Sequence, residues 1–202
     1  RQNYSLYIED KWRIHSMLES QFGLRGFYHY KGDHYTVDPR LSFVFHYSPE
    51  SRFKLAGGRY SQFINVMTLG DFFSNFDVWF PIDQTIDPGR SDQFVFGYEM
   101  DLEKGLLNSD IDDDLEFTAE GYYTDMKNVA TFNPMVDEGD EAKDAFVLGD
   151  GTAYGLEWML RKKSGRLSGW LGYSLSWTTR QYEDQILINE GKEYYPKWDR
   201  RH

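Results

Sequence analysis

The segment Ser168-Gly169-Trp170-Leu171-Gly172-Tyr173-Ser174-Leu175-Ser176-Trp177 alternates between two kinds of side chain. Every second position from Leu171 to Trp177 is apolar or aromatic, whereas the positions between them are small or polar. Because side chains alternate between the two sides of a strand, this spacing predicts a β-strand with one apolar face and one polar face.

The same alternation recurs along the rest of the chain. In residues 92–102, for example, Phe94, Phe96 and Tyr98 alternate with more polar or smaller neighbours. We expect strands over residues 4–13, 17–30, 39–47, 52–63, 92–102, 114–132 and 152–162, and over the quoted segment as far as residue 180. Gly57-Gly58 inside one of them indicates a bulge or a close approach of another group. The pattern predicts an all-β chain of about eight strands.

The links between these strands alternate between short and long. Turn-forming residues fill the short links, and the link over 103–113 takes the same place in the alternation. The short links are residues 14–16, 48–51 and 163–166, and the long ones are 31–38, 64–91, 133–151 and 181–195. Outer-membrane barrels have short periplasmic turns and long outer loops. We therefore expect a contiguous antiparallel up-and-down meander that is part of a larger transmembrane β-barrel.

Alternation alone is also compatible with a soluble β-sandwich, in which the apolar face is an inner core. Two properties favour the barrel: the asymmetry of the links, and the absence of an obvious long crossover of the Greek-key kind. The alternative function that goes with a sandwich is a carbohydrate-binding module that uses exposed Tyr and Trp side chains.

The composition of the 202-residue chain narrows the possible functions. A net charge of −11 argues against nucleic-acid binding, which needs a basic surface. Without cysteine there is no disulfide framework and no thiol nucleophile. Aromatic residues make up 18% of the chain, which suits a barrel with aromatic girdles at two membrane interfaces. The sequence contains no run of about 18 apolar residues, so it predicts no transmembrane helix.

Both ends of the sequence point to a piece of a longer protein. No charged segment followed by an apolar one, as in a signal peptide, precedes the first expected strand. The last residues, Asp199-Arg200-Arg201-His202, stop without a terminating element. We expect residues 1–202 to be one partial barrel domain, without a plug and incomplete at both ends.

Several segments, in this order and spacing, resemble the barrel of TonB-dependent outer-membrane receptors of the Bacteroidota type. The resemblance covers nearly the whole chain. It is carried by residues 38–42 (DPRLS), 53–63 (FKLAGGRYSQF), 90–93 (RSDQ), 120–128 (EGYYTDMKN), 151–157 (GTAYGLE), 163–176 (KSGRLSGWLGYSLS) and 196–202 (PKWDRRH).

The resemblance implies a fold and a function. Such receptors have about 22 strands around a plugged lumen, so this chain would supply roughly a third of the wall. They take up bulky, scarce nutrients such as ferric siderophores, cobalamin or glycans across the outer membrane of Gram-negative bacteria. Their partners are outer-membrane lipid, the small-molecule or glycan ligand and the TonB complex, which is reached through the plug region. It implies a transporter rather than an enzyme, with no cofactor.

The long link over residues 64–91 is the candidate ligand-binding element, because aromatic side chains concentrate in it. An aromatic outer loop could bind a ligand, although packing of the loop against the barrel mouth would equally explain why aromatic residues concentrate there. These candidate residues are Phe72, Phe73, Phe76, Trp79 and Phe80.

Other motifs carry little chemistry. Residues 110–114 (DIDDD) and 137–141 (DEGDE) lack the Gly and Glu spacing of an EF-hand and are expected to be solvated acidic turns. Histidine spacing predicts no metal site, apart from a weak possibility that His29 and His34 share one. The glycines of residues 149–155 are expected to relieve crowding at the barrel rim. Neither catalytic nor metal-ligating residues are expected.

Overall fold

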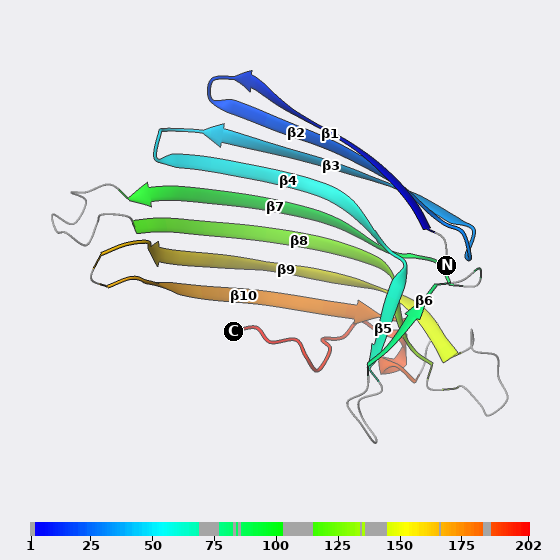
Figure 1. Cartoon of the computed structure of the whole chain (residues 1–202). Coiled ribbons are helices and arrows are strands. Elements are labelled where there is room, and N and C mark those ends of the chain that lie inside the picture. Colours follow the sequence, from blue (N-terminus) through cyan, green and yellow to red (C-terminus); the bar gives the residue numbers. More distant parts are fainter. Residues whose placement is uncertain are drawn as a thin grey trace.

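The computed structural model of the chain contains one large antiparallel sheet (Figure 1). It describes residues 3–68, 77–82, 84, 86–102, 115–133, 135, 145–165, 167–183 and 187–202. Eight strands lie in the order β1-β2-β3-β4-β7-β8-β9-β10, which confirms the predicted meander. Their bounds are β1 Asn3–His15, β2 Leu18–His29, β3 His34–His46, β4 Ser51–Gln62, β7 Gly89–Leu102, β8 Leu115–Phe132, β9 Phe146–Lys162 and β10 Gly169–Gln181.

The register of the sheet gathers the apolar side chains on one face. Residues that lie directly opposite each other on paired strands share a face. One such row runs across the sheet through Leu55, Phe96, Gly121, Leu156 and Leu175. A neighbouring row on the opposite face consists of polar or small residues: Lys54, Gly97, Glu120, Glu157 and Ser174. The sheet therefore has an apolar face and a polar face over its whole width.

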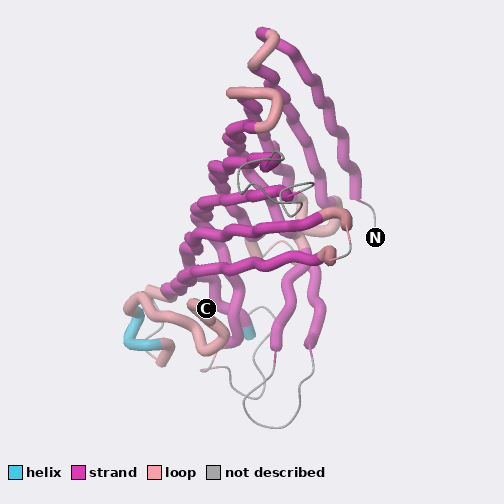
Figure 2. The backbone as a smooth tube through the Cα atoms, turned by 90° about the vertical axis from the view of Figure 1, so that its left-hand side faces the viewer, coloured by secondary structure: helices cyan, strands magenta, loops and turns pink. Residues whose placement is uncertain are grey.

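No second layer formed by the described residues covers the apolar face. Phe94 is 58% exposed and Leu171 is 62% exposed, although both are large and apolar. Figure 2 shows that the strands follow a single curved surface. The sandwich alternative is wrong, because a sandwich would seal these side chains between two sheets. Hydrocarbon is the solvent that matches such a surface.

The links differ in part from the predicted ones. Residues 31–38 were expected to be a long link, but β3 begins at His34 and the link is residues 30–33. Asp33 adopts a left-handed backbone, with φ of 52°, and accepts a hydrogen bond from the Tyr28 hydroxyl at 2.9 Å. The expected strand begins at Pro39, but the alternation continues through residues 34–37 on the N-terminal side of this proline, and β3 includes them.

Two other long links contain strand residues. β9 begins at Phe146, so that the last part of the expected link 133–151 belongs to the sheet. The expected link 64–91 contains a separate two-stranded hairpin of β5 (Ile64–Thr68) and β6 (Asp77–Pro81), and β7 begins at Gly89. The acidic residues 110–114 and 137–141 lie outside the described residues.

A segment after β10 returns along the free side of this strand. Arg180 and Tyr194 exchange two backbone hydrogen bonds, of 3.0 and 2.9 Å, and Ser176 N–H donates to the Arg201 carbonyl at 3.3 Å. The Asp199 carboxylate accepts a hydrogen bond from the Thr178 N–H at 3.0 Å. The outer edge of β10 is therefore partly covered, which limits the pairing that a bare edge strand invites.

Helical structure is minor in the described part of the chain. A 3₁₀ turn spans Asn189–Gly191. None of the described helices has the length and apolar character needed to cross a membrane.

Candidate ligand-binding wall

The β5–β6 hairpin lies at the end of the sheet where β4 ends and β7 begins (Figure 1). Its base is attached to β2. Phe63 stacks on Phe27 with 4.1 Å between ring centroids, and the His29 ring contacts the Ile82 carbonyl through Nε2 at 3.1 Å. Phe27 and His29 belong to the polar face, and Ile82 is completely buried. The hairpin is therefore held on the side that would face the lumen of a barrel.

The two described members of the predicted aromatic cluster have different environments. Phe80 stacks on Phe146 of β9, with ring centroids 3.9 Å apart, so the hairpin also packs on the sheet at a second place. Trp79 is 70% exposed. Phe72, Phe73 and Phe76 lie outside the described residues. Packing against the sheet thus explains the aromatic side chain at position 80, whereas the side chain of Trp79 is exposed and could contact a ligand.

A cavity of about 920 Å³ lies beside the hairpin on the polar face. The cavity is lined by residues of the hairpin and of β2, β4, β7, β8 and β10. The cavity therefore exists only because the hairpin folds back. Its lining includes Phe27, Tyr60, Asn65, Thr124 and Arg180. The size and the mixture of aromatic and polar groups match those of small-molecule sites.

Asn65 belongs to the lining of this cavity and carries a buried amide nitrogen without a hydrogen-bond partner among the described residues. It lies on β5 and is only 7% exposed. A buried amide without a partner costs on the order of 1–3 kcal/mol, so such groups are rare unless something else binds them.

Arg180 supplies a cation to the same cavity. Its guanidinium lies 5.3 Å from the ring centroid of Trp198 and donates to the Thr179 carbonyl at 3.0 Å. No carboxylate among the described residues forms an ion pair with it. Nearby Tyr182 lies just after β10 and is 3% exposed; burial raises the pKa of its hydroxyl above the usual value. The cavity lining also contains Arg90 and Lys127, but these pair with Asp92 and Asp150, whereas Arg180 has no such partner among the described residues.

Toward the short turns, the charges on the polar face neutralise each other. Glu19 pairs with Lys11 and Arg13, at 2.8 and 3.0 Å. Glu99 pairs with Arg52 and Lys54.

The same holds in the turn after β9. Lys163 pairs with Glu116 at 3.3 Å and with Asp101 at 3.4 Å. Its hydrogen bond to Glu116 is the main reason why the pKa of the Lys163 ammonium is raised. Lys11, Arg13, Arg52, Lys54 and Lys163 thus have carboxylate partners, in contrast to Arg180.

The weak expectation of a metal at His29 and His34 is not supported by their surroundings. His29 is 3% exposed, and its ring nitrogens contact Asn3 Oδ1 at 2.7 Å and the Ile82 carbonyl. No metal-binding group of three or more His, Asp or Glu side chains occurs in the part of the chain that the structure describes. His29 thus anchors the hairpin, a role that its sequence position did not indicate.

The glycines behave as predicted where another group approaches. A Cβ on Gly155 would lie 2.6 Å from the Leu175 carbonyl oxygen and 2.8 Å from the Tyr122 hydroxyl. A Cβ on Gly57 would lie 3.1 Å from the Phe94 ring, which explains the Gly57-Gly58 pair as a close approach. The register of β4 has no irregularity there.

The fold and the two-faced wall define the class: a segment of an outer-membrane type β-barrel. The chain belongs to the family described as TonB dependent receptor-like, beta-barrel, whose sequence model matches residues 1–198. Among solved structures it is similar to the siderophore receptor PirA from Pseudomonas aeruginosa, at 16% sequence identity and a TM-score of 0.57. That match covers 90% of this chain and 37% of PirA, so the chain spans little more than a third of its length. No curated protein matches the chain.

Proposed function

We propose that this chain is part of the barrel wall of an outer-membrane receptor that takes up a bulky, scarce nutrient with energy supplied through TonB. Family membership supports the class of protein. The observation that carries the binding role is the cavity beside the β5–β6 hairpin, which is lined by Asn65 and by Arg180, a cation without a carboxylate partner among the described residues. Residues 1–202 are then one part of a longer barrel, whose further strands extend the sheet from the free edge of β1.

The lining of the cavity favours a ligand rich in oxygen acceptors. A guanidinium and a buried amide both donate hydrogen bonds, and aromatic rings such as Phe27 and Tyr60 provide apolar contact. Ferric siderophores combine these properties, so we place them first among the candidate nutrients, with cobalamin and glycans as the other candidates. Trp79 and the aromatic residues Phe72, Phe73, Phe76 and Phe80 would contribute from the outer loop.

The partners follow from the same proposal. Outer-membrane lipid contacts the apolar face, and the TonB complex acts through a plug region outside this chain. The location is the outer membrane of a Gram-negative bacterium, and the role is transport rather than catalysis.

Uptake by the whole receptor tests the proposal. Cells that carry the receptor are given radiolabelled ferric siderophores, cobalamin or oligosaccharides, and the same cells with TonB inactivated serve as the energy control. We expect TonB-dependent uptake of at least one of them, and tighter binding by wild type than by the Asn65→Leu/Arg180→Gln double variant. Arg59→Gln is the matched control, because Arg59 pairs with Asp92 at 2.7 Å away from the cavity. Absence of TonB-dependent uptake for all three classes would contradict the proposal.

A further inference from the structure

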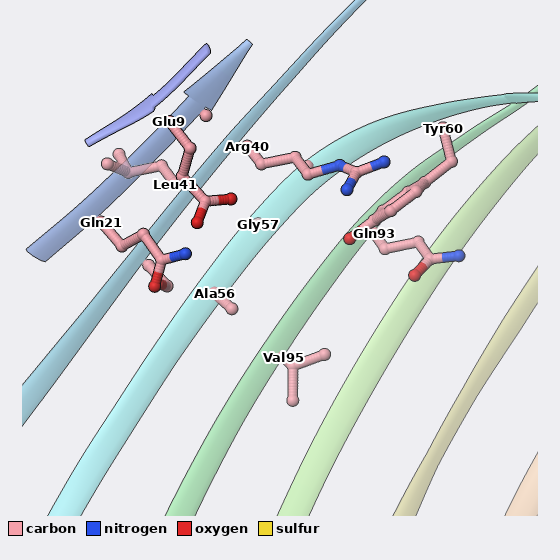
Figure 3. Close-up of a pocket in the computed structure, with 12 residues that line it drawn as sticks. Glu9, Gln21, Arg40, Leu41, Ala56, Gly57, Tyr60, Gln93 and Val95 are labelled. Atoms are coloured by element: carbon pink, nitrogen blue, oxygen red, sulfur yellow. The ribbon is translucent and has the colours of Figure 1, made fainter. Parts of the chain in front are cut away.

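A second, smaller hollow lies on the polar face next to the cavity of the hairpin (Figure 3). Its volume is about 250 Å³. Tyr60 and Gln93 line both spaces, so the two are neighbours along the wall. Residues with small side chains from three adjacent strands form its floor: Gly23, Ser42, Ala56 and Gly58. The hollow therefore exists because the wall lacks bulk at these positions.

Arg40 of β3 lies in this hollow between two glycines. The register places it directly opposite Gly23 on one side and Gly58 on the other. A Cβ on Gly58 would lie 3.1 Å from Arg40 Cγ and 3.3 Å from the Pro39 carbonyl oxygen, so any other residue there would displace the arginine stem. The guanidinium lies 4.6 Å from the Tyr60 ring centroid, a cation–π contact that restricts its position.

The charge of Arg40 is not neutralised by the described wall. Arg52 and Lys54 on the same face share Glu99, and Lys11 pairs with Glu19. No carboxylate in the described ranges forms an ion pair with Arg40. Glu9 lines the other side of the hollow, across Gly23, and Figure 3 shows the Arg40 side chain extending away from it toward Tyr60.

We propose that this hollow is a carboxylate-binding subsite in the lumen wall, with Arg40 as the group that binds a carboxylate of the ligand. A guanidinium binds carboxylates through two parallel hydrogen bonds, and no carboxylate of the described residues occupies that of Arg40. Gln21 and Gln93 line the hollow and offer amide groups to further oxygen atoms of the ligand. The inference rests on the proposed function, because only in a receptor does this face line the path of a ligand.

Citrate, which carries three carboxylates, is the probe for this subsite. Calorimetry on the detergent-solubilised whole receptor compares citrate with triethyl citrate, in which all three carboxylates are esterified. We expect citrate to bind and triethyl citrate not to bind. Loss of a charge-assisted hydrogen-bond pair predicts that Arg40→Gln weakens citrate binding about ten- to hundredfold, with Arg40→Lys in between.

Two further variants separate a specific contact from a general change of charge. Arg52→Gln removes one positive charge from the same face, but one that Glu99 already neutralises, so citrate affinity is expected to stay at the wild-type value. Glu9→Gln removes a like charge from the hollow and is expected to tighten citrate binding. Correct folding of each variant is checked by heat-dependent migration on a gel.

Equal citrate affinity in wild type and Arg40→Gln would overturn the subsite, as would absence of citrate binding to the wild-type receptor at millimolar concentration. Failure of the proposed function gives a different result. In that case TonB-dependent uptake is absent, while Arg40-dependent binding of citrate persists.

Discussion

The carbonyl oxygen of Leu175 on β10 lies so close to Gly155 on β9 that a Cβ at Gly155 would be only 2.6 Å away. Both groups belong to regularly paired strands, with Gly155 opposite Ser176. A backbone carbonyl in a sheet cannot move without disturbing its hydrogen bonds. The two strands thus approach each other in a way that requires glycine at this position.

This contact predicts that Gly155→Ala destabilises the barrel. Overpacking of this kind costs about 1–3 kcal/mol, which unfolding of the whole receptor in denaturant measures as a lower midpoint. Gly172→Ala is the matched control on the polar face of β10, because its Cβ would make an ordinary contact at 3.6 Å with the Trp158 carbonyl. Equal midpoints for the two variants would contradict the account of Gly155.

The hairpin is expected to loosen when its stacking contact is removed. Phe63→Ala deletes the ring that stacks on Phe27, a contact worth about 0.5–1.5 kcal/mol beyond the buried area. Limited proteolysis of the whole receptor should then cleave within the hairpin faster than in wild type. Trp79→Ala is the control, since Trp79 is largely exposed, and a similar cleavage rate in both variants would show that Phe63 does not anchor the hairpin.

Alkaline pH is expected to destabilise the region after β10 through Tyr182. Burial raises the pKa of its hydroxyl above the ordinary value of 10.0 in the folded state. Below that value the hydroxyl is protonated in both states and stability does not change. Above it the unfolded state releases the proton first, so stability falls as the pH rises. The Tyr182→Phe variant should lose less stability than wild type when the pH is raised from neutral to above 10, as measured by thermal unfolding. An identical loss in both proteins would show that Tyr182 does not cause the alkaline destabilisation.

A charge on the apolar face is expected to cost far more than one on the polar face. Phe96 is 54% exposed and sits in an apolar row in the middle of the sheet. Phe96→Lys should destabilise the receptor in lipid bilayers by about 2–4 kcal/mol, the cost known for lysine near the membrane midplane. Thr118→Lys on the polar face of β8 is the comparison, and unfolding of both in bilayers measures the difference. Similar costs at the two positions would mean that the faces are assigned incorrectly.

The eight strands could be predicted because alternation with a period of two survives wherever one face meets an apolar environment. Boundaries were harder to predict: residues 146–150 (FVLGD) continue β9 with three consecutive apolar residues instead of an alternation, and residues 34–37 extend β3 on the N-terminal side of Pro39. The β5–β6 hairpin was missed since five-residue strands inside an aromatic loop give too short a pattern.

The candidate site was less predictable than the sheet. Asn65 and Arg180 are far apart in sequence and come to one cavity only because the hairpin folds over the polar face. No local pattern contains that information. Arg40 could have been noticed, because it alternates with apolar neighbours and the glycines of β2 and β4 are visible in the sequence; their pairing with it requires the register.

The environment of the two faces can be measured directly with nitroxide spin labels. The chain contains no cysteine, so single cysteines at positions 93 to 96 of β7 can each carry one label in the whole receptor, reconstituted in lipid bilayers. We predict that labels replacing Phe94 and Phe96 collide mainly with oxygen dissolved in lipid, and that labels replacing Gln93 and Val95 collide less with it. If the labels at positions 94 and 96 were shielded from oxygen dissolved in lipid, the claim that the apolar face of the sheet contacts the membrane would be contradicted.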